Sequence, residues 1–164
     1  MASAGFMFVT ASGSSISGES SVTSEGRENS IQIVEVQHDV LVPSDSMSGV
    51  STGTRQHRTL RVTARVDKAT PMMYQAWASN APCEVQLRFW RPDRTGSGIE
   101  TEYFQIELTG ARVASVKMHW PNSLRADTAA IQEQVEYGFT YHTITWTFLT
   151  GGISFQDDWY SAPP

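Results

Sequence analysis

The side chains that most often do chemistry in proteins are few in this sequence and far apart. Histidine occurs four times, at His38, His57, His119 and His142, and none has a second His or a Cys at the spacing of a metal-ligand pair. A zinc site is therefore not expected, and each imidazole should be either hydrogen-bonded within the fold or in contact with water. A site assembled in space from distant residues stays open at this point.

The other candidates for acid–base or nucleophilic chemistry are also weak. Asp157 and Asp158 are neighbours, and neighbours on an extended chain point to opposite faces, so we expect a solvated pair rather than a shared acid and base. Cys83 follows a proline and has no histidine beside it in sequence, which favours a half-buried, unreactive thiol. We expect no catalytic residue, no bound metal and no cofactor.

One long polar segment stands out between two strand-like runs. Residues Pro43 to His57 (PSDSMSGVSTGTRQH) are too many, and too rich in Ser, Gly and Thr, for a hairpin turn. The run before it, Ile31 to Val42, is rich in β-branched residues, and the run after it, Leu60 to Val66, alternates apolar with polar residues. We expect an arm that projects from a sheet and either covers a site or grips another chain.

Length and charge restrict the class of protein. The chain has 164 residues, enough for one domain with one core, and 12 Lys and Arg against 17 Asp and Glu give a net charge of −5. The basic residues are scattered, which argues against a nucleic-acid partner. The apolar patch from Phe6 to Val9 lacks the positive region and the length of a signal peptide, and no segment is long enough to span a membrane. We expect a chain made in the cytoplasm that, if exported, leaves without a cleavable signal.

The rest of the pattern predicts a mainly β protein. Alternating apolar residues indicate strands over Glu84–Arg91, Glu102–Leu108 and Arg112–Met118. Asp93–Gly98 and Gly110 are expected to be the turns between them, so that the three strands form a meander.

Near the C-terminus the apolar parity changes. Val135, Tyr137, Phe139 and Tyr141 share one parity, whereas Ile144, Trp146 and Phe148 share the other. A bend at His142 and Thr143, where the chain passes from one sheet into another, would produce this change. The alternative is a strand covered on both faces, one by the core and one by a partner.

One short helix is expected after the residue pair Lys68–Ala69. Thr70 is the expected N-cap and Pro71 the first helical residue, and Asn80 and Pro82 end the helix. The helix should flank a barrel and bury Met73 and Trp77, which form an apolar stripe with Met72 and Ala76.

The aromatic content exceeds what one small barrel with one helix needs. The chain has five Trp, five Tyr and seven Phe, and Trp90 and Tyr103 stand on the outward parity of their strands. Covered outward surface indicates self-association, and a closed ring of like subunits provides it through repeated head-to-tail contacts.

The sequence then resembles a known family through an ordered set of short segments. They are ISGES from Ile16, SIQIVEVQH from Ser30, GTRQH ending at His57, VDKATP from Val66, FWRP from Phe89, LTGARVASV from Leu108, and YHTITW from Tyr141 before the final Asp158-Trp159. Together they span nearly the whole chain, and they are similar to the Hcp family, the haemolysin-coregulated proteins of the bacterial type VI secretion system.

The resemblance implies a fold and an assembly but no chemistry. The fold would be a compact two-sheet β-barrel with one short flanking helix and a long extended loop, forming a single tube domain over residues 1–164. Six copies would form a ring, and rings would stack into a hollow tube that a contracting sheath drives out of the cell. Such a tube carries a spike at its tip and holds small effector proteins in its lumen, and family members occur in the cytoplasm and in the culture medium. Some members carry a fused toxin domain, which the few residues after Trp159 leave no room for.

This resemblance gives the arm and two other regions expected roles. Ring-to-ring stacking is expected at Ser44, Asp45, Ser48, Thr52, Thr54, Arg55, Gln56 and His57. Trp90 and Tyr103 are expected at the contact between subunits of a ring. Glu35 and Gln37 are expected to face the lumen, although they would look the same as ordinary solvent-facing strand residues.

Two other functions compete with the tube subunit. A monomeric β-barrel that binds a small ligand or carbohydrate would need an apolar cavity with a few polar groups. A hydrolytic effector would need a nucleophile and a base, which the sequence does not display.

Overall fold

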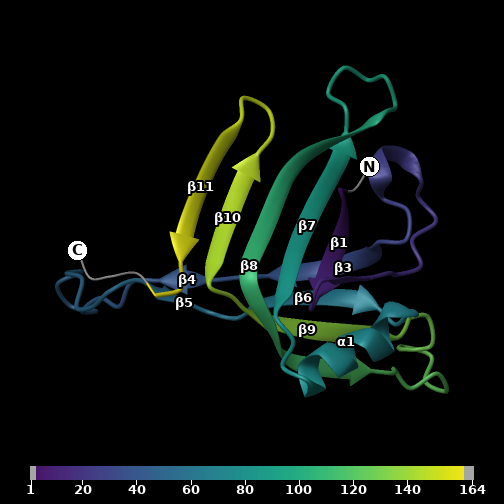
Figure 1. Ribbon diagram of the computed structural model, residues 1–164, viewed down its shortest axis with the longest axis horizontal. Helices are drawn as coiled ribbons and strands as arrows, with labels where there is room; N and C mark the ends of the chain where they lie inside the picture. Colours follow the sequence, from purple (N-terminus) through teal and green to yellow (C-terminus); the bar gives the residue numbers. More distant parts are fainter. Residues whose placement is uncertain (1–2, 161–164) are drawn as a thin grey trace.

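The computed structural model describes residues 3–160 and is built mainly of β-strands (Figure 1). The ends of the domain expected over 1–164, including the residues after Tyr160, lie outside the described part. The strands are β1 (Ala4–Ala11), β2 (Ser14–Ile16), β3 (Ile31–Gln37), β4 (Val40–Leu41), β5 (Gln56–His57), β6 (Leu60–Arg65), β7 (Cys83–Pro92), β8 (Glu100–His119), β9 (Gln134–Thr140), β10 (Thr143–Phe148) and β11 (Ile153–Asp158). The helices are α1 (Ala69–Ala78) and a 3₁₀ turn, Ser24–Gly26. Within residues 3–160, no helix has the length and apolar character needed to cross a membrane.

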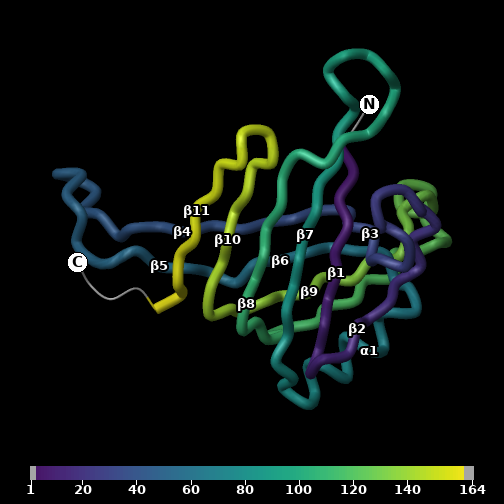
Figure 2. The backbone as a smooth tube through the Cα atoms, turned by 45° about the horizontal axis from the view of Figure 1, so that its top comes forward, coloured from purple at the N-terminus to yellow at the C-terminus, as the bar shows by residue number. Residues whose placement is uncertain are grey.

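Six strands close on themselves through antiparallel pairing. Their order is β8, β7, β1, β3, β6 and β9, and β9 pairs back onto β8. β10 pairs with the first half of β8 on the side away from β7, and β11 pairs with β10, so these two strands extend beyond the closed part (Figures 1 and 2). We call β10 and β11 the wing. The mainly β class expected from the sequence is confirmed.

β8 belongs to both sides of the barrel. Its first half pairs with β7 and β10, and its second half pairs with β9. The sequence predicted a turn at Gly110, but the strand runs through it and bends there with φ +62. A Cβ at Gly110 would lie 2.9 Å from the Cβ of His142, so glycine allows both the positive φ and the close approach. The expected β7–β8 hairpin over Asp93–Gly98 is confirmed, and the separate meander strand is wrong.

The expected corner near the C-terminus is confirmed. β9 pairs with β6 and the second half of β8, whereas β10, after Tyr141 and His142, pairs with the first half of β8. Tyr137 and Phe139 on β9 and Ile144 on β10 are all fully buried. The parity change therefore keeps both strands facing one core where the chain bends between β9 and β10.

The core lies inside the closed strands. Met7 and Val9 of the N-terminal apolar patch are buried in β1, against Leu87 of β7. Each fully buried side chain of this size contributes about 1.5–3 kcal/mol relative to exposure. Cys83 is also buried, and burial raises the pKa of its thiol, as expected for an unreactive cysteine.

The helix α1 packs against β8, but its start and its buried face differ from expectation. It begins at Ala69 with Lys68 at the N-cap, and the Asp67 carboxylate accepts the Ala69 N–H at 2.9 Å, so the predictions of Thr70 as N-cap and Pro71 as first helical residue are both wrong. Met73 is fully buried, as expected. Trp77 is 49% exposed, because the packed line runs through Ala69, Met73 and Ala76.

Candidate functional site: the arm, its base and the outer faces of the barrel

The polar segment after β4 forms an ordered arm that projects from the barrel, as expected (Figures 1 and 2). β4 and β5 pair at its base, and farther out the Thr52 N–H donates to the Pro43 carbonyl at 2.8 Å. At the tip, Asp45 accepts the Met47 N–H at 3.0 Å and the Ser48 hydroxyl at 2.8 Å, and these hydrogen bonds lower the pKa of Asp45. The arm therefore holds its shape through its own hydrogen bonds.

Most of the predicted stacking residues are exposed on this arm. Ser44, Asp45, Ser48, Thr52, Thr54 and Gln56 are all exposed. The tip also presents Met47, which is 95% exposed, and Val50, which is 63% exposed. Sequence reasoning passed over these two apolar residues because they sit within a run of polar ones.

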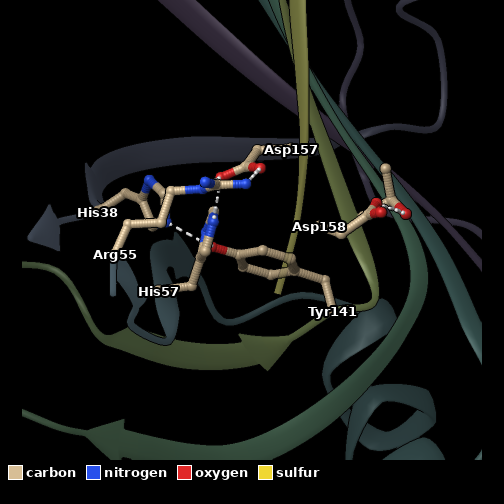
Figure 3. Close-up of polar contacts among 7 residues, drawn as sticks. His38, Arg55, His57, Tyr141, Asp157 and Asp158 are labelled. Carbon is tan, nitrogen blue, oxygen red and sulfur yellow. Dashed lines mark hydrogen bonds and ion pairs between the residues drawn. The ribbon is translucent and has the colours of Figure 1, made fainter. Parts of the chain in front are cut away.

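The base of the arm is tied to the barrel by a connected set of polar side chains (Figure 3). The Nδ1 atom of His57 lies 2.9 Å from the Tyr141 Oη, and its Nε2 lies 2.7 Å from Oδ2 of Asp157. The Nε2 of His38 lies 2.8 Å from the same Tyr141 Oη. Arg55 donates to both carboxylate oxygens of Asp157, at 2.8 and 2.7 Å. We call His38, Arg55, His57, Tyr141 and Asp157 the latch.

The latch joins four separate segments of the chain. His38 comes just before β4, Arg55 and His57 lie at and beside β5, Tyr141 lies between β9 and β10, and Asp157 is on β11. The Trp159 ring packs on Tyr141, with centroids 4.8 Å apart. Both sides of the arm base are thus held to the barrel and to the wing.

The electrostatics of the latch follow from these contacts. The hydrogen bonds from Arg55, and then from His57, hold the pKa of Asp157 at about 2, so this carboxylate is ionised at neutral pH. Burial, and then the charge of His57, lower the pKa of His38. Burial raises the pKa of Tyr141, which therefore keeps its proton and both donates and accepts hydrogen bonds. The described residues contain no group of three or more His, Cys, Asp or Glu side chains that could hold a metal ion.

Two sequence expectations fail here. His57 was expected at the stacking surface, but it is 8% exposed and both of its nitrogens have partners within the chain. Asp157 was expected to be solvated, but its side chain is 12% exposed, and its neighbour Asp158 alone of the pair is exposed. Arg55 remains 48% exposed while it holds Asp157.

The expected subunit contact at Trp90 is wrong. Trp90 does stand on the outward parity of β7, but it is fully buried by its own chain. Arg27 and Arg88 lie over its ring, and its Nε1–H donates to the Glu25 carboxylate. The segment around the 3₁₀ turn therefore covers this part of the outer face.

Tyr103 is only half-buried. It lies at a register shift where β8 pairs with β7, and its ring meets Phe148 of the wing edge-on at 6.4 Å. The guanidinium of Arg91 lies 4.5 Å from the ring centre. Part of the Tyr103 ring therefore remains exposed beside the wing, where a neighbouring molecule could contact it.

Glu35 and Gln37 belong to a mainly polar outer face, on which Val34, at the bulge of β3, is an exposed apolar residue. They are exposed on β3, and the cross-strand partners on the same face of β6, β9 and β8 are polar as well. This polar face comprises Glu35, Gln37, Arg61, Thr63, Arg65, Ser115, Lys117, His119, Gln134 and Glu136. It carries three basic side chains, Arg61, Arg65 and Lys117, and two acidic ones, Glu35 and Glu136, so neither sign of charge strongly dominates.

A contrasting apolar groove lies between the arm base and the wing. It has a volume of about 420 Å³, and its walls include Val40, Val42, Trp146 and Phe155. The rings of Trp146 and Phe155 stack at 6.0 Å, yet Phe155 is 65% exposed. The sequence analysis did not single out Phe155. Recognising the hairpin of β10 and β11 would have placed Phe155 opposite Trp146.

Residues 6–148 match the family model described as "Type VI secretion system effector, Hcp". The chain belongs to the Hcp family. A curated relative, the "Major exported protein" of Pseudomonas aeruginosa, is 30% identical over 138 residues, which cover 84% of this chain and 79% of that protein.

Solved Hcp structures share the whole fold. A structure described as a crystal structure of Hcp protein superposes with a TM-score of 0.85 at 25% identity, covering 98% of this chain and all of that one. The Hcp1 protein of E. coli EAEC 042, solved as a double mutant with two introduced tryptophans, gives 0.80 at 26% identity, with 96% and 99% covered. The family resemblance carried by the short sequence motifs is confirmed.

Proposed function

We propose that this chain is the subunit of a type VI secretion inner tube, in which six copies form a ring and rings stack into a hollow tube. The tube leaves the cytoplasm when a surrounding sheath contracts, meets spike proteins at its tip and carries small effector proteins in its lumen to the medium or to a target cell. The observation that carries this proposal is the match of residues 6–148 to the Hcp family model. The polar arm and the two contrasting outer faces support it.

The polar face is the proposed lumen wall. A conduit needs a surface that stays hydrated and holds cargo weakly, and a face of mixed charges, amides and hydroxyls meets that need. Four strands of the barrel contribute to this face, with Glu35 and Gln37 near its edge on β3. We therefore keep these two residues as lumen-facing.

The wing and its groove are the proposed contact between subunits of a ring. Val40, Val42 and Phe155 expose apolar surface in one place, and Tyr103 adjoins it through Phe148. Burying such a surface against a second copy is favourable by about 25 cal/mol for each Å² of apolar area. We therefore keep Tyr103 in the proposed interface between subunits and no longer include Trp90, which is buried within its own chain.

The outer part of the arm is the proposed contact between rings. Its exposed hydroxyl, amide and carboxylate groups at Ser44, Asp45, Ser48, Thr52, Thr54 and Gln56 would supply several modest hydrogen bonds. Arg55 contributes by holding the base of the arm, with part of its side chain still exposed. Contacts of this kind favour stacks that are weaker than the rings.

Native mass spectrometry of the purified protein tests the proposal. Six chains per particle, with multiples of six at higher concentration, are the expected result. A single chain per particle at micromolar concentration would contradict it, and would favour the monomeric barrel.

A further inference from the structure

Two imidazoles of the latch share one hydroxyl group. The Nε2 of His38 and the Nδ1 of His57 lie 2.8 and 2.9 Å from the Oη of Tyr141. A phenol has one proton to donate and two lone pairs to accept with. The protonation of either imidazole therefore decides which hydrogen bonds the other one can make.

The latch satisfies its hydrogen bonds when neither or one of the imidazoles is charged. With both neutral, His38 donates to Tyr141, Tyr141 donates to His57, and His57 donates to Asp157. With His57 charged, its Nδ1–H donates to Tyr141, whose hydroxyl turns and donates to the neutral His38. Each state leaves every polar group in the chain of contacts with a partner.

When both imidazoles are charged, the latch cannot satisfy all of its hydrogen bonds. Both N–H groups then point at one oxygen, and the hydroxyl proton has no acceptor within the latch. Two like charges also lie on either side of a single atom, which is unfavourable in a partly buried site.

The charged groups around the latch offset a second positive charge only in part: the charge of Asp39 raises the pKa of His38, but burial and the charge of His57 lower it by more. On β11 and at β5, Asp157 is already paired with Arg55, and beside β4, Asp39 is paired with Arg58 at 3.4 Å. Asp158 of β11 is exposed and accepts the Thr143 hydroxyl at 2.9 Å. The carboxylates of Asp157 and Asp39 thus each already have an arginine, and the second imidazolium has no carboxylate of its own.

We propose that the latch is an acid-sensitive device: it holds the base of the arm while at most one of His38 and His57 is charged, and it releases the arm when both are. Burial and the charge of His57 lower the pKa of His38 from its usual 6.5, so His38 resists protonation while the arm is held. The hold is therefore complete above pH 6.5 and weakens as the pH falls below that value. Release is a property of one chain, and only its effect on ring stacking rests on the proposed function.

Hydrogen–deuterium exchange of the intact assembled protein tests this proposal. Peptides that cover residues 39–58 would be followed at pH 7.5 and pH 5.0, with exchange times scaled for the intrinsic effect of pH. In the wild type, protection at β4 and β5 should fall by about tenfold at the lower pH, which corresponds to about 1.4 kcal/mol. Unchanged protection would overturn the proposal.

Substitutions at two latch residues separate a switch from a merely structural contact. His38→Gln keeps a donor for Tyr141 but cannot become charged, so its arm should stay protected at pH 5.0. His119→Gln, at an exposed position on the polar face, is the matched control and should show the wild-type loss. The same loss in His38→Gln as in the wild type would overturn the proposal.

Tyr141→Phe tests the shared hydroxyl directly. The ring can keep its contact with Trp159, but the arm should lose protection already at pH 7.5. Wild-type protection in this variant would overturn the role of the hydroxyl. The test reads protection at β4 and His57, at the base of the arm, and not at the outer residues proposed to contact the next ring. A protein that never stacks would therefore contradict the proposed function and leave this test intact.

Discussion

The guanidinium carbon of Arg27 lies 4.6 Å from the centre of the Trp90 ring, and both residues are almost completely buried. Arg27 also pairs with Glu100 at 2.6 Å, and Arg88 covers the ring from β7 at 4.9 Å. The segment from β2 to β3 is therefore fixed across the outer face of β1 and β7 by one buried cation. This segment covers the outer side of the barrel wall at Trp90.

Replacing Arg27 should destabilise the protomer strongly. Arg27→Ala removes the cation over Trp90 and leaves the Glu100 carboxylate without its partner, so we expect a loss of about 3 kcal/mol in the free energy of unfolding. Arg125→Ala is the control, since its pair with Asp127 is exposed on both sides and should change stability by less than about 0.5 kcal/mol. Urea denaturation measures both, and equal losses would contradict the account.

The stability of the protein should fall at acid pH because the Asp157 carboxylate becomes protonated there. Its pKa is lowered from 3.8 to about 2, so its contribution is fully present above pH 3.8 and is lost as the pH falls through about 2. Asp157→Asn should remove about 2 kcal/mol at pH 7 and flatten the change in stability between pH 4 and pH 2. Asp158→Asn, at the exposed neighbour, should retain the wild-type profile in the same denaturation series, and an equal effect of the two changes would count against the latch contacts.

The wing should be needed for ring formation but not for folding. Phe155→Asp places a charge in the apolar groove, and we expect it to weaken association of subunits by about tenfold or more. Ile99→Asp is a matched control, because Ile99 is also 65% exposed but lies in the β7–β8 loop. Native mass spectrometry measures the fraction of rings, with circular dichroism as the check on folding. Intact rings in Phe155→Asp would show that subunits meet elsewhere.

Salt should promote the stacking of rings. Each chain carries a net charge of −5, so the six copies of the proposed ring would carry −30, and such rings should repel one another at low ionic strength. Light scattering should therefore show longer assemblies at 0.5 M salt than at 0.02 M. A decrease in assembly size with added salt would contradict this account of the repulsion.

Local patterns in the sequence predicted most of the strands but not what covers them. The β7–β8 hairpin follows from alternating residues on either side of Asp93–Gly98, and the corner at His142 follows from a change of parity. Parity also places Trp90 outward, but it carries no information on the segment near Arg27 that covers the ring. Gly110 was taken for a turn because a positive φ within a continuous strand and one within a turn have the same sequence signature.

The latch could not be predicted from the sequence for a related reason. His57 lies 84 residues from Tyr141 and 100 residues from Asp157, so no spacing rule connects them. They meet because β5, the β9–β10 corner and β11 converge at the arm base, which depends on the closure of the whole barrel. The projecting arm was predictable, since its length and polarity are local properties.

Averaged electron micrographs of the purified protein, viewed down the particle axis, test the central claim most directly. Six subunits should surround a central channel, with the face of Glu35, Gln37 and Lys117 turned towards it and the wing at each subunit contact. Separate compact particles without a channel, or a channel lined by the face that carries Arg27, would contradict the account.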